Sequence, residues 1–365
     1  MTTPRVPLSV LDLSTVSDGG TSRDALAATT ALARRADELG YTRFWVAEHH
    51  SMPAVASTAP AVLIAHLAAH TGRIRIGSGG VMLPNHPALV VGEQFAMLEA
   101  LYPDRIDLGI GRAPGADPVT AAALRRSANG DPVEQFPVDL VDTLALLGRP
   151  APGRALSAVA QRLRATPAAI SSPPVWLLGS STYSARLAGE LGLPFAYAHH
   201  FSTGQTDAAV ATYRESFRPS EALASSRLVL TTSVLVAPTV AEARFLAGPS
   251  RVMALSLRTG RLGPVVSPDD AADALAELER TAPAQLSALL AELPGTQVVG
   301  TVTDAVAALE ALVDRTGADE LMITGTAYDV QTRIETLEHL AAGWGLHAPD
   351  AGERGSAAGS AQVSG

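Results

Sequence analysis

The 365-residue sequence contains no cysteine. That absence excludes disulfides, thiolate nucleophiles, cysteine-ligated zinc and iron–sulfur clusters. The sequence also contains no lysine, so all 27 of its basic residues other than histidine are arginines. Without lysine the chain lacks the amine that Schiff-base enzymes use as a nucleophile, and it lacks the lysine of a nucleotide-binding P-loop. Several large classes of enzyme mechanism are thereby excluded.

Basic residues are also outnumbered, because 27 of them face 36 acidic residues and give a formal net charge of −9. This charge argues against nucleic acid or an anionic membrane as a partner. No apolar run reaches a membrane-spanning length, and residues 1–6 lack the apolar core of a signal peptide, so we expect a cytoplasmic protein. With 47% hydrophobic and 17% charged residues, the chain can bury a large core.

Apolar segments of strand length alternate with helical segments along most of the chain. Strands are predicted at residues 7–14, 43–49, 74–83, 105–112, 175–179, 195–201, 228–236 and 320–324. Helices are predicted at residues 23–39, 57–70, 87–101, 137–147, 184–191 and 206–217, the first opened by a possible capping box of Thr21 and Asp24. Strands separated by such helices form parallel sheets, and eight of them predict an α/β fold, a (β/α)8 TIM-like barrel.

Two segments depart from this alternation. Residues 239–300 are predicted to be an insertion of helices and loops between the seventh and eighth strands. Residues 351–365 are rich in glycine, serine and alanine, and we expect them to be a disordered tail. The remaining chain, residues 1–350, is predicted to form a single domain.

The second predicted strand ends in three ionisable residues, Glu48, His49 and His50. Barrels of this class place their chemistry at the C-terminal ends of the strands. Adjacent strand residues point to opposite faces, so Glu48 and His50 share one side and His49 the other. The alternation argues against the whole triplet forming one metal site. It favours one side chain facing a ligand while its neighbours support the wall.

The third predicted strand contains Gly77, Gly79 and Gly80 around Ser78. Glycine inside a strand usually marks a bulge or the close approach of another backbone or a planar ligand. A tight corner of the barrel is the alternative interpretation.

Two segments are candidates for binding a phosphate. Val175–Gly179 is an apolar strand followed by the hydroxyls of Ser180 and Ser181 and then by a helix, a pattern typical of an anion site. Plain N-capping by either serine has the same sequence pattern. Arg112, at the end of the fourth predicted strand, can hold a phosphate bidentately or serve as a surface ion-pair partner.

The other histidines fall into two groups. His66 and His70 share a helix face but lack a third ligand, and His86 precedes a helix and is predicted only to orient a loop. His199 and His200 end the sixth predicted strand, at the same mouth of the barrel as His49. A metal-dependent barrel hydrolase needs a His-x-His pair on a strand, which neither adjacent pair supplies, so we expect no metal site.

Taken together, these motifs resemble those of the bacterial-luciferase-like flavin monooxygenases, and most of all the group with Val-Leu-Asp-Leu-Ser near its start. The resemblance covers the predicted barrel nearly end to end, through residues 7–14, 43–50, 74–84, 93–112, 175–181, 192–201 and 318–323. It implies a TIM-like barrel that binds reduced FMN at the C-terminal ends of its strands.

The resemblance also implies roles for individual residues. His49 matches the family's active-site histidine, and Gly80 lies near a non-proline cis peptide beneath the flavin ring. Arg112 and Ser180 match phosphate-binding positions. The cofactor-binding residues predicted on these grounds are Ser78, Gly79, Gly80, Arg112, Gly179, Ser180, Ser181 and His199. Gly111 and Gly179 stand where luciferase has a reactive cysteine and a carboxylate, which argues against light emission and an aldehyde substrate.

The implied activity is oxygenation of a small organic substrate, for example in secondary metabolism, with reduced FMN and O2. Reduced FMN is expected from a separate NAD(P)H-dependent flavin reductase, and the resemblance implies a homodimer. Histidine, whose unperturbed pKa is about 6.5, can move a proton during such a reaction, and His49 is the candidate for this role. Two alternatives stay open: a hydride transferase that uses a deazaflavin on the same barrel, and a flavin-binding protein without catalysis.

Overall fold

A computed structural model gives the structure of the chain. It describes residues 5–113, 118–124, 132–168, 171–259, 262–291, 293 and 295–346. The predicted tail at residues 351–365 lies outside the described residues. In the described part of the chain, no helix is both long and apolar enough to cross a lipid bilayer.

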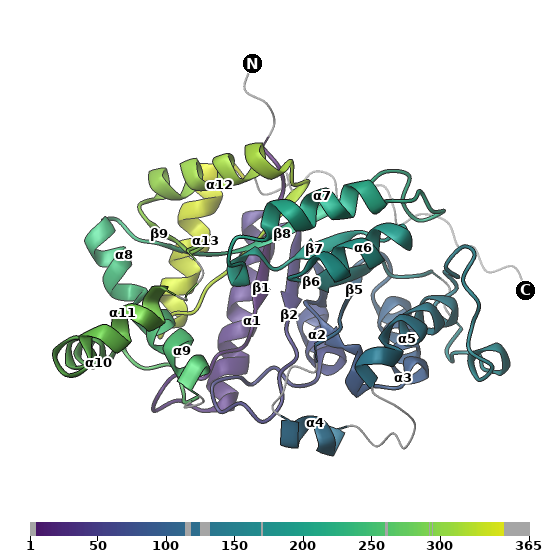
Figure 1. Cartoon of the computed structure of the whole chain (residues 1–365), viewed down its shortest axis with the longest axis horizontal. Helices are drawn as coiled ribbons and strands as arrows, with labels where there is room; N and C mark the ends of the chain where they lie inside the picture. The colour runs from purple at the N-terminus through teal and green to yellow at the C-terminus, as the bar shows by residue number, and fades with distance from the viewer. Residues whose placement is uncertain are drawn as a thin grey trace, which may run out of the picture.

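Parallel strands form a closed barrel at the centre of the molecule (Figure 1). In sheet order, the strands are β1 (Leu8–Asp12), β2 (Arg43–Val46), β3 (Arg75–Ser78), β5 (Ile106–Gly111), β6 (Val175–Gly179), β7 (Phe195–Tyr197), β8 (Leu228–Val236) and β10 (Glu320–Thr324). The barrel closes because β10 pairs with β1 on one side and with β8 on the other. This closure confirms the predicted (β/α)8 barrel.

Helices follow the strands and cover the outside of the barrel (Figure 1). They are α1 (Ser22–Leu39), α2 (Pro60–Ala69), α3 (Ala88–Leu101), α5 (Pro132–Leu146), α6 (Thr182–Glu190), α7 (Thr206–Ser216), α12 (Val302–Thr316) and α13 (Val330–Trp344), with the short α4 (Pro118–Leu124) before α5. The predicted capping box of Thr21 and Asp24 is present at the start of α1, and Gly40 ends that helix in the left-handed conformation. Local sequence signals therefore fix both ends of α1.

Side chains on the two faces of the strands pack in separate clusters. The outward-facing side chains join the helices in one large core. A smaller cluster contains Leu11, Trp45, Trp176, Ala196, Val229 and Met322 and fills the barrel interior. In it, the rings of Trp45 and Trp176 meet edge to face with centroids 5.5 Å apart. The alternation along each strand separates these two layers.

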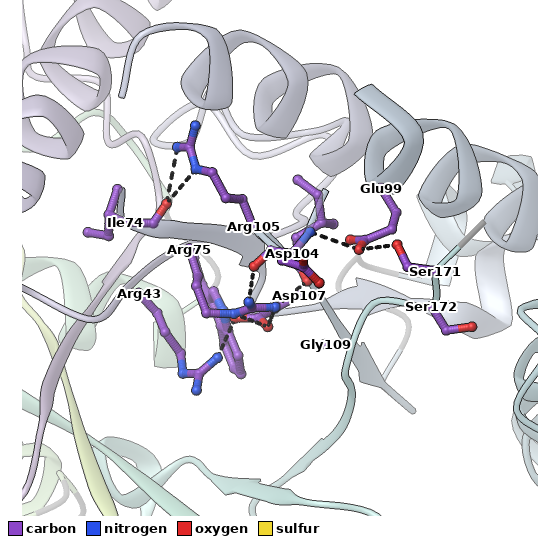
Figure 2. Close-up of polar contacts among 12 residues, drawn as sticks. Arg43, Ile74, Arg75, Glu99, Asp104, Arg105, Asp107, Gly109, Ser171 and Ser172 are labelled. Carbon is purple, nitrogen blue, oxygen red and sulfur yellow. Dashed lines mark hydrogen bonds and ion pairs between the residues drawn. The ribbon is translucent and has the colours of Figure 1, made fainter. Parts of the chain in front are cut away.

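Charged side chains form a buried network near the N-terminal ends of the strands. Arg43 Nη1 lies 2.6 Å from Asp107 Oδ2, and Arg43 Nε lies 2.9 Å from Glu320 Oε1. Arg75 Nη2 lies 2.8 Å from Asp107 Oδ1, and Figure 2 shows Arg43 and Arg75 reaching this carboxylate from neighbouring strands. Burial opposes the charge of Arg43, but Asp107 and Glu320 raise its pKa above the ordinary value. The network closes this end of the barrel with paired charges.

The segment between β8 and α12 folds mainly as helices, as predicted. It contains α8 (Val240–Leu246), α9 (Gly248–Thr259), α10 (Pro268–Thr281), α11 (Pro283–Ala291) and β9 (Val298–Gly300), and its helices lie at the left of Figure 1. Val265 N donates to Val16 O at 2.8 Å, and Asp18 N donates to Val265 O at 2.8 Å. Since Val16 and Asp18 follow β1, these bonds tie the insertion to the C-terminal side of the barrel.

The third predicted strand, at residues 74–83, is not continuous. β3 ends at Ser78, and a separate short strand, β4 (Val81–Met82), pairs with β5. Glycine is required at the break, because a Cβ on Gly80 would lie only 2.8 Å from Gly109 O. The prediction was wrong about continuity but placed the close approach of two backbones correctly.

Three other predicted boundaries shift. The sixth strand ends at Tyr197, and His199–Phe201 form a 3-10 helix, η3, rather than the end of a strand. The second helix begins at Pro60 rather than at residue 57, because Ser57 Oγ donates to Ala47 O at 2.6 Å. Helix α5 begins at Pro132 and contains Pro137 in its interior. The helix predicted at residues 137–147 therefore begins five residues earlier than expected.

Candidate functional site

The predicted site residues lie where neighbouring strands end. Glu48, His49 and His50 follow β2, the glycine pair Gly79–Gly80 follows β3, Arg112 follows β5 and Gly179–Ser181 end β6. The strands β2, β3, β5 and β6 are adjacent and parallel in this order. Their C-terminal ends therefore form one continuous arc of the barrel mouth.

A buried carboxylate organises the residues after β2. Glu48 Oε1 lies 2.9 Å from His50 Nε2 and 2.8 Å from His86 Nε2, and Glu48 Oε2 accepts from Met82 N at 3.0 Å. Burial opposes the charge of Glu48, but hydrogen bonds from His86 and His50 and the charge of His86 hold its pKa below the ordinary value. The contact confirms that Glu48 and His50 share one side.

One residue in this arrangement was placed differently by sequence. His86 was predicted only to orient a loop, whereas its imidazole bonds to Glu48 from the segment that follows β4. His49 is half-buried, and its backbone N–H donates to Ser57 O at 3.0 Å. Since β2 ends at Val46 and not at residue 49 as predicted, His49 lies beyond the strand, and its catalytic role stays a prediction.

The break after β3 joins two strands through a side chain. The peptide bond between Gly79 and Gly80 is cis, at the place where the family resemblance implied one. Ser78 is fully buried, and its Oγ donates to Gly109 O and accepts from Gly109 N, both at 2.9 Å. The Ser78 side chain therefore takes the place of ladder hydrogen bonds between β3 and β5. Its contact with a cofactor stays a prediction.

The start of α6 has the features of an anion site. Ser181 is the N-cap residue of α6, yet its side chain makes no capping hydrogen bond to the described helix backbone. Plain N-capping by Ser181 is therefore not its role in this structure. The guanidinium of Arg112 lies 4.2 Å from the ring centre of Tyr183, in the first turn of the same helix. A positive side chain, a helix N-terminus and a serine hydroxyl are brought together.

The two histidines after β7 have different partners. His199 is buried and its Nδ1 lies 2.7 Å from Thr206 Oγ1, at the first turn of α7; burial, followed by the charge of Arg315, lowers its pKa. His200 Nδ1 lies 3.2 Å from Thr231 O on β8, and burial lowers its pKa to about 4. His200 is thus a neutral part of the barrel wall. The contact of His199 with a cofactor stays a prediction.

A cavity of about 780 Å³ lies at the opposite end of the barrel. Its walls include Pro174, Trp176, Pro194 and Arg227, which stand at or just before the starts of β6, β7 and β8. The size of a hollow therefore does not identify the site in this protein. The residues predicted to bind a cofactor or to move a proton lie at the other end of the barrel.

Two solved structures with low sequence identity share the barrel. One is the oxygenating constituent of 3,6-diketocamphane monooxygenase from Pseudomonas putida in complex with FMN, at 19% identity and a TM-score of 0.66 over 92% of this chain and 97% of that one. Another is an F420-dependent secondary alcohol dehydrogenase, at 16% identity and a TM-score of 0.63 over 95% of this chain and 100% of that one. At such identities the likeness concerns the fold alone.

Other proteins share a larger part of the sequence as well as the fold. The uncharacterized protein YvbT of Bacillus subtilis is 42% identical over 92% of this chain and 96% of its own length. A luciferase-like monooxygenase of Escherichia coli is 38% identical over 93% of this chain and 97% of its own length. The crystal structure of apo-MsnO8 is 38% identical, with a TM-score of 0.83 over 94% of this chain and 99% of that one.

A sequence model of the luciferase-like monooxygenases matches residues 6–320, which include seven strands of the barrel in full and the first residue of β10. Both the match and the identity of the relatives extend over nearly the whole described fold. The chain therefore belongs to the luciferase-like monooxygenase family, a family of oxidoreductases.

Proposed function

We propose that the protein is a monooxygenase that uses reduced FMN and O2 to oxygenate a small organic substrate. The observation that carries the proposal is the anion site at the start of α6. There, Arg112 stands beside Tyr183, and Ser181 has a side chain that is not used for capping. A dianionic phosphate at the end of a flavin side chain fits such a site in charge and in hydrogen-bonding capacity.

The residues of the barrel mouth fit the rest of this role. When bound, reduced FMN supplies the electrons for the reaction with O2, and the protein supplies binding, orientation and shielding from water. Arg112, Gly179, Ser180 and Ser181 hold the phosphate, while Ser78, Gly79, Gly80 and His199 shape the wall beside the flavin. His49, half-buried at the end of β2, holds or moves a proton at its imidazole.

The main alternative is hydride transfer with a deazaflavin, because F420-dependent enzymes share the barrel. Membership of a monooxygenase family and the 38% identity to a relative named as a monooxygenase favour oxygenation. The test is oxygen uptake by the purified protein with reduced FMN and, separately, with reduced F420, in the presence of candidate substrates. We expect substrate-dependent uptake with reduced FMN. Turnover with reduced F420 and no oxygen uptake would show that the protein is a deazaflavin-dependent hydride transferase. Binding of FMN without turnover would indicate a non-catalytic flavoprotein.

The proposal includes two protein partners. A separate NAD(P)H-dependent reductase supplies reduced FMN. A second copy of the chain pairs through α2 and α3, which expose Val62 (72%), Val90 (40%), Met97 (52%) and Leu101 (60%). Apolar side chains this exposed on two adjoining helices favour burial against a partner. Light scattering at micromolar concentration should give the mass of a dimer, and Met97→Glu should shift it toward the monomer.

A further inference from the structure

Three potential metal ligands converge at the mouth of the barrel although they come from two separate segments. The ligand atoms of Glu48, His50 and His86 all lie within 4.8 Å of one another. Glu48 and His50 follow β2, whereas His86 ends the 3-10 helix η1 (Leu83–Asn85).

We propose that Glu48, His50 and His86 form a binding site for a divalent transition-metal ion such as Zn²⁺. Two imidazole nitrogens and one carboxylate oxygen are ligands that Zn²⁺ and its first-row neighbours prefer. The absence of cysteine leaves histidine and carboxylate as the strong ligands that this chain can offer such an ion. The inference is independent of the proposed flavin chemistry.

The distances fit an ion after a small adjustment. Both imidazole Nε2 atoms lie 2.8–2.9 Å from Glu48 Oε1. Ligand bonds of about 2.0–2.1 Å at tetrahedral angles separate ligand atoms by about 3.3 Å, so each imidazole nitrogen needs to move about 0.5 Å away from the carboxylate oxygen. The two imidazole nitrogens already lie within 4.8 Å of each other. Asn85 Nδ2 lies 3.5 Å from the same oxygen, and a turn of this amide can present Oδ1 as a fourth ligand. Water can otherwise complete the coordination.

The surroundings hold the carboxylate and leave a way in. The Glu48 side chain is 0% exposed, and its second oxygen is fixed by the backbone N–H of Met82 at 3.0 Å. The side chains of His50 and His86 are 18% and 29% exposed. An ion can therefore reach the imidazoles from solvent. The carboxylate is already oriented by its hydrogen bond from Met82, in the way that second-shell hydrogen bonds orient the ligands of known metal sites.

Binding of the ion would tie together two segments that flank the predicted active site. One side of the tie is next to His49, and the other side follows Gly79–Gly80 through β4 and η1. The ion would thus fix the spacing of these walls without touching the anion site at α6. We expect it to raise the melting temperature of the protein, because a ligand that binds only the folded state stabilises it.

The chain offers a matched control for adventitious binding. His66 and His70 lie one helical turn apart on α2, with ring centroids 4.2 Å apart, and such a pair can also attract Zn²⁺. His66 Nε2 lies 3.1 Å from Thr30 Oγ1, and His70 Nδ1 lies 2.7 Å from His66 O, so the pair lacks a carboxylate ligand. His86→Ala and His70→Ala therefore distinguish the two places.

The experiment is calorimetric titration of the untagged, chelator-treated protein with ZnCl2, repeated with CoCl2 while visible absorption of the bound ion is recorded. We expect one ion per chain, Co²⁺ bands typical of nitrogen and oxygen ligands, and a higher melting temperature. His86→Ala and Glu48→Gln should weaken binding at least about tenfold, while His70→Ala should leave it unchanged. His86→Ala keeps the test valid if Glu48→Gln does not fold, because His86 is partly exposed. Absence of binding in the wild type, or loss of binding in His70→Ala but not in His86→Ala, would overturn the proposal.

Discussion

The two ends of the barrel each contain a buried carboxylate with two nitrogen-bearing partners, but the partners differ. At the N-terminal end, Asp107 lies between Arg43 and Arg75, which carry a charge at every physiological pH. At the C-terminal end, Glu48 lies between the imidazoles of His50 and His86, whose nitrogens can either donate to the carboxylate or bind a metal ion. A similar arrangement therefore gives a permanent ion pair at one end of the barrel and a set of potential metal ligands at the other.

The polar groups at the two ends of the barrel also differ in their exposure to solvent. Near Asp107, the indole Nε1 of Trp45 donates to the carboxylate at 3.1 Å, so protein groups satisfy it from several sides. At the opposite mouth, His49 is half-buried, and Ser180 is exposed to solvent. A buried charge is therefore not by itself a sign of catalysis in this protein. Function is expected where the polar groups remain accessible to a ligand.

The strongest test of the chemical end is His49→Ala. If His49 moves a proton during turnover, product formation should fall by about 10²–10⁴-fold, the usual contribution of general acid–base catalysis. FMN affinity and the melting temperature should stay close to the wild type, and hydrogen peroxide should account for more of the oxygen consumed. Product formation and peroxide are measured together by chromatography and a peroxidase assay.

His70→Ala is the matched histidine control for that experiment, because His70 ends α2 away from the mouth and should affect neither product nor peroxide. If His49→Ala turned over normally while His50→Ala was folded but inactive, the assignment of faces after β2 would be reversed.

At the other end of the barrel, Asp107→Asn should affect stability and not chemistry. The variant leaves Arg43 and Arg75 without the full charge of their shared partner, and breaking a buried pair typically costs about 3–5 kcal/mol. Urea unfolding followed by circular dichroism measures the change. The control is Glu310→Gln, which removes an exposed ion pair with Arg5 and should cost less than about 1 kcal/mol. Equal losses in the two variants would contradict the structural role of the network.

A smaller effect is expected from the anion site. Loss of a charge-assisted hydrogen bond costs about 1.5–3 kcal/mol, so Arg112→Ala should weaken binding of reduced FMN by roughly tenfold to a hundredfold. The affinity is measured anaerobically by fluorescence titration. Arg154→Ala is the control, since Arg154 pairs with Glu190 at the other end of α6 and should not alter the affinity. Unchanged affinity in a folded Arg112→Ala variant would remove Arg112 from the site.

Most of the barrel could be predicted from the sequence, because its strands are short apolar runs and α1 has a capping box and a terminal glycine. What local patterns missed depends on contacts between distant segments. The break after Ser78 exists because β5 approaches at Gly109, and β7 stops at Tyr197 because the chain turns into η3. Neither feature can be predicted from a short stretch of sequence taken by itself.

The candidate site divides in the same way. The order of residues predicted that Glu48 and His50 share a side, because alternation is local. It could not join His86 to them, since 36 positions separate His86 from His50 in the sequence and only the closed barrel brings them together. The sequence therefore did not predict the potential metal ligands, because they come from two segments and not from one adjacent pair of histidines on a single strand.

The last expected effect is absent at neutral pH and concerns the pH dependence of stability. Burial lowers the pKa of His200 to about 4, whereas an unfolded histidine titrates near about 6.5. As the pH falls from 6.5 toward 4, His200 takes up a proton in the unfolded chain but stays neutral in the folded protein. This residue therefore lowers the free energy of unfolding by up to about 1.4 kcal/mol per pH unit.

The variant His200→Asn keeps a donor for Thr231 O but cannot titrate. We expect the two urea-derived stability curves to run parallel above pH 7 and the variant to lose less stability below pH 6.5. Asp139, whose pKa burial raises to about 6, acts in the opposite direction but is present in both proteins and cancels. Equal slopes on the acid side would show that His200 does not stay neutral in the wall between β7 and β8.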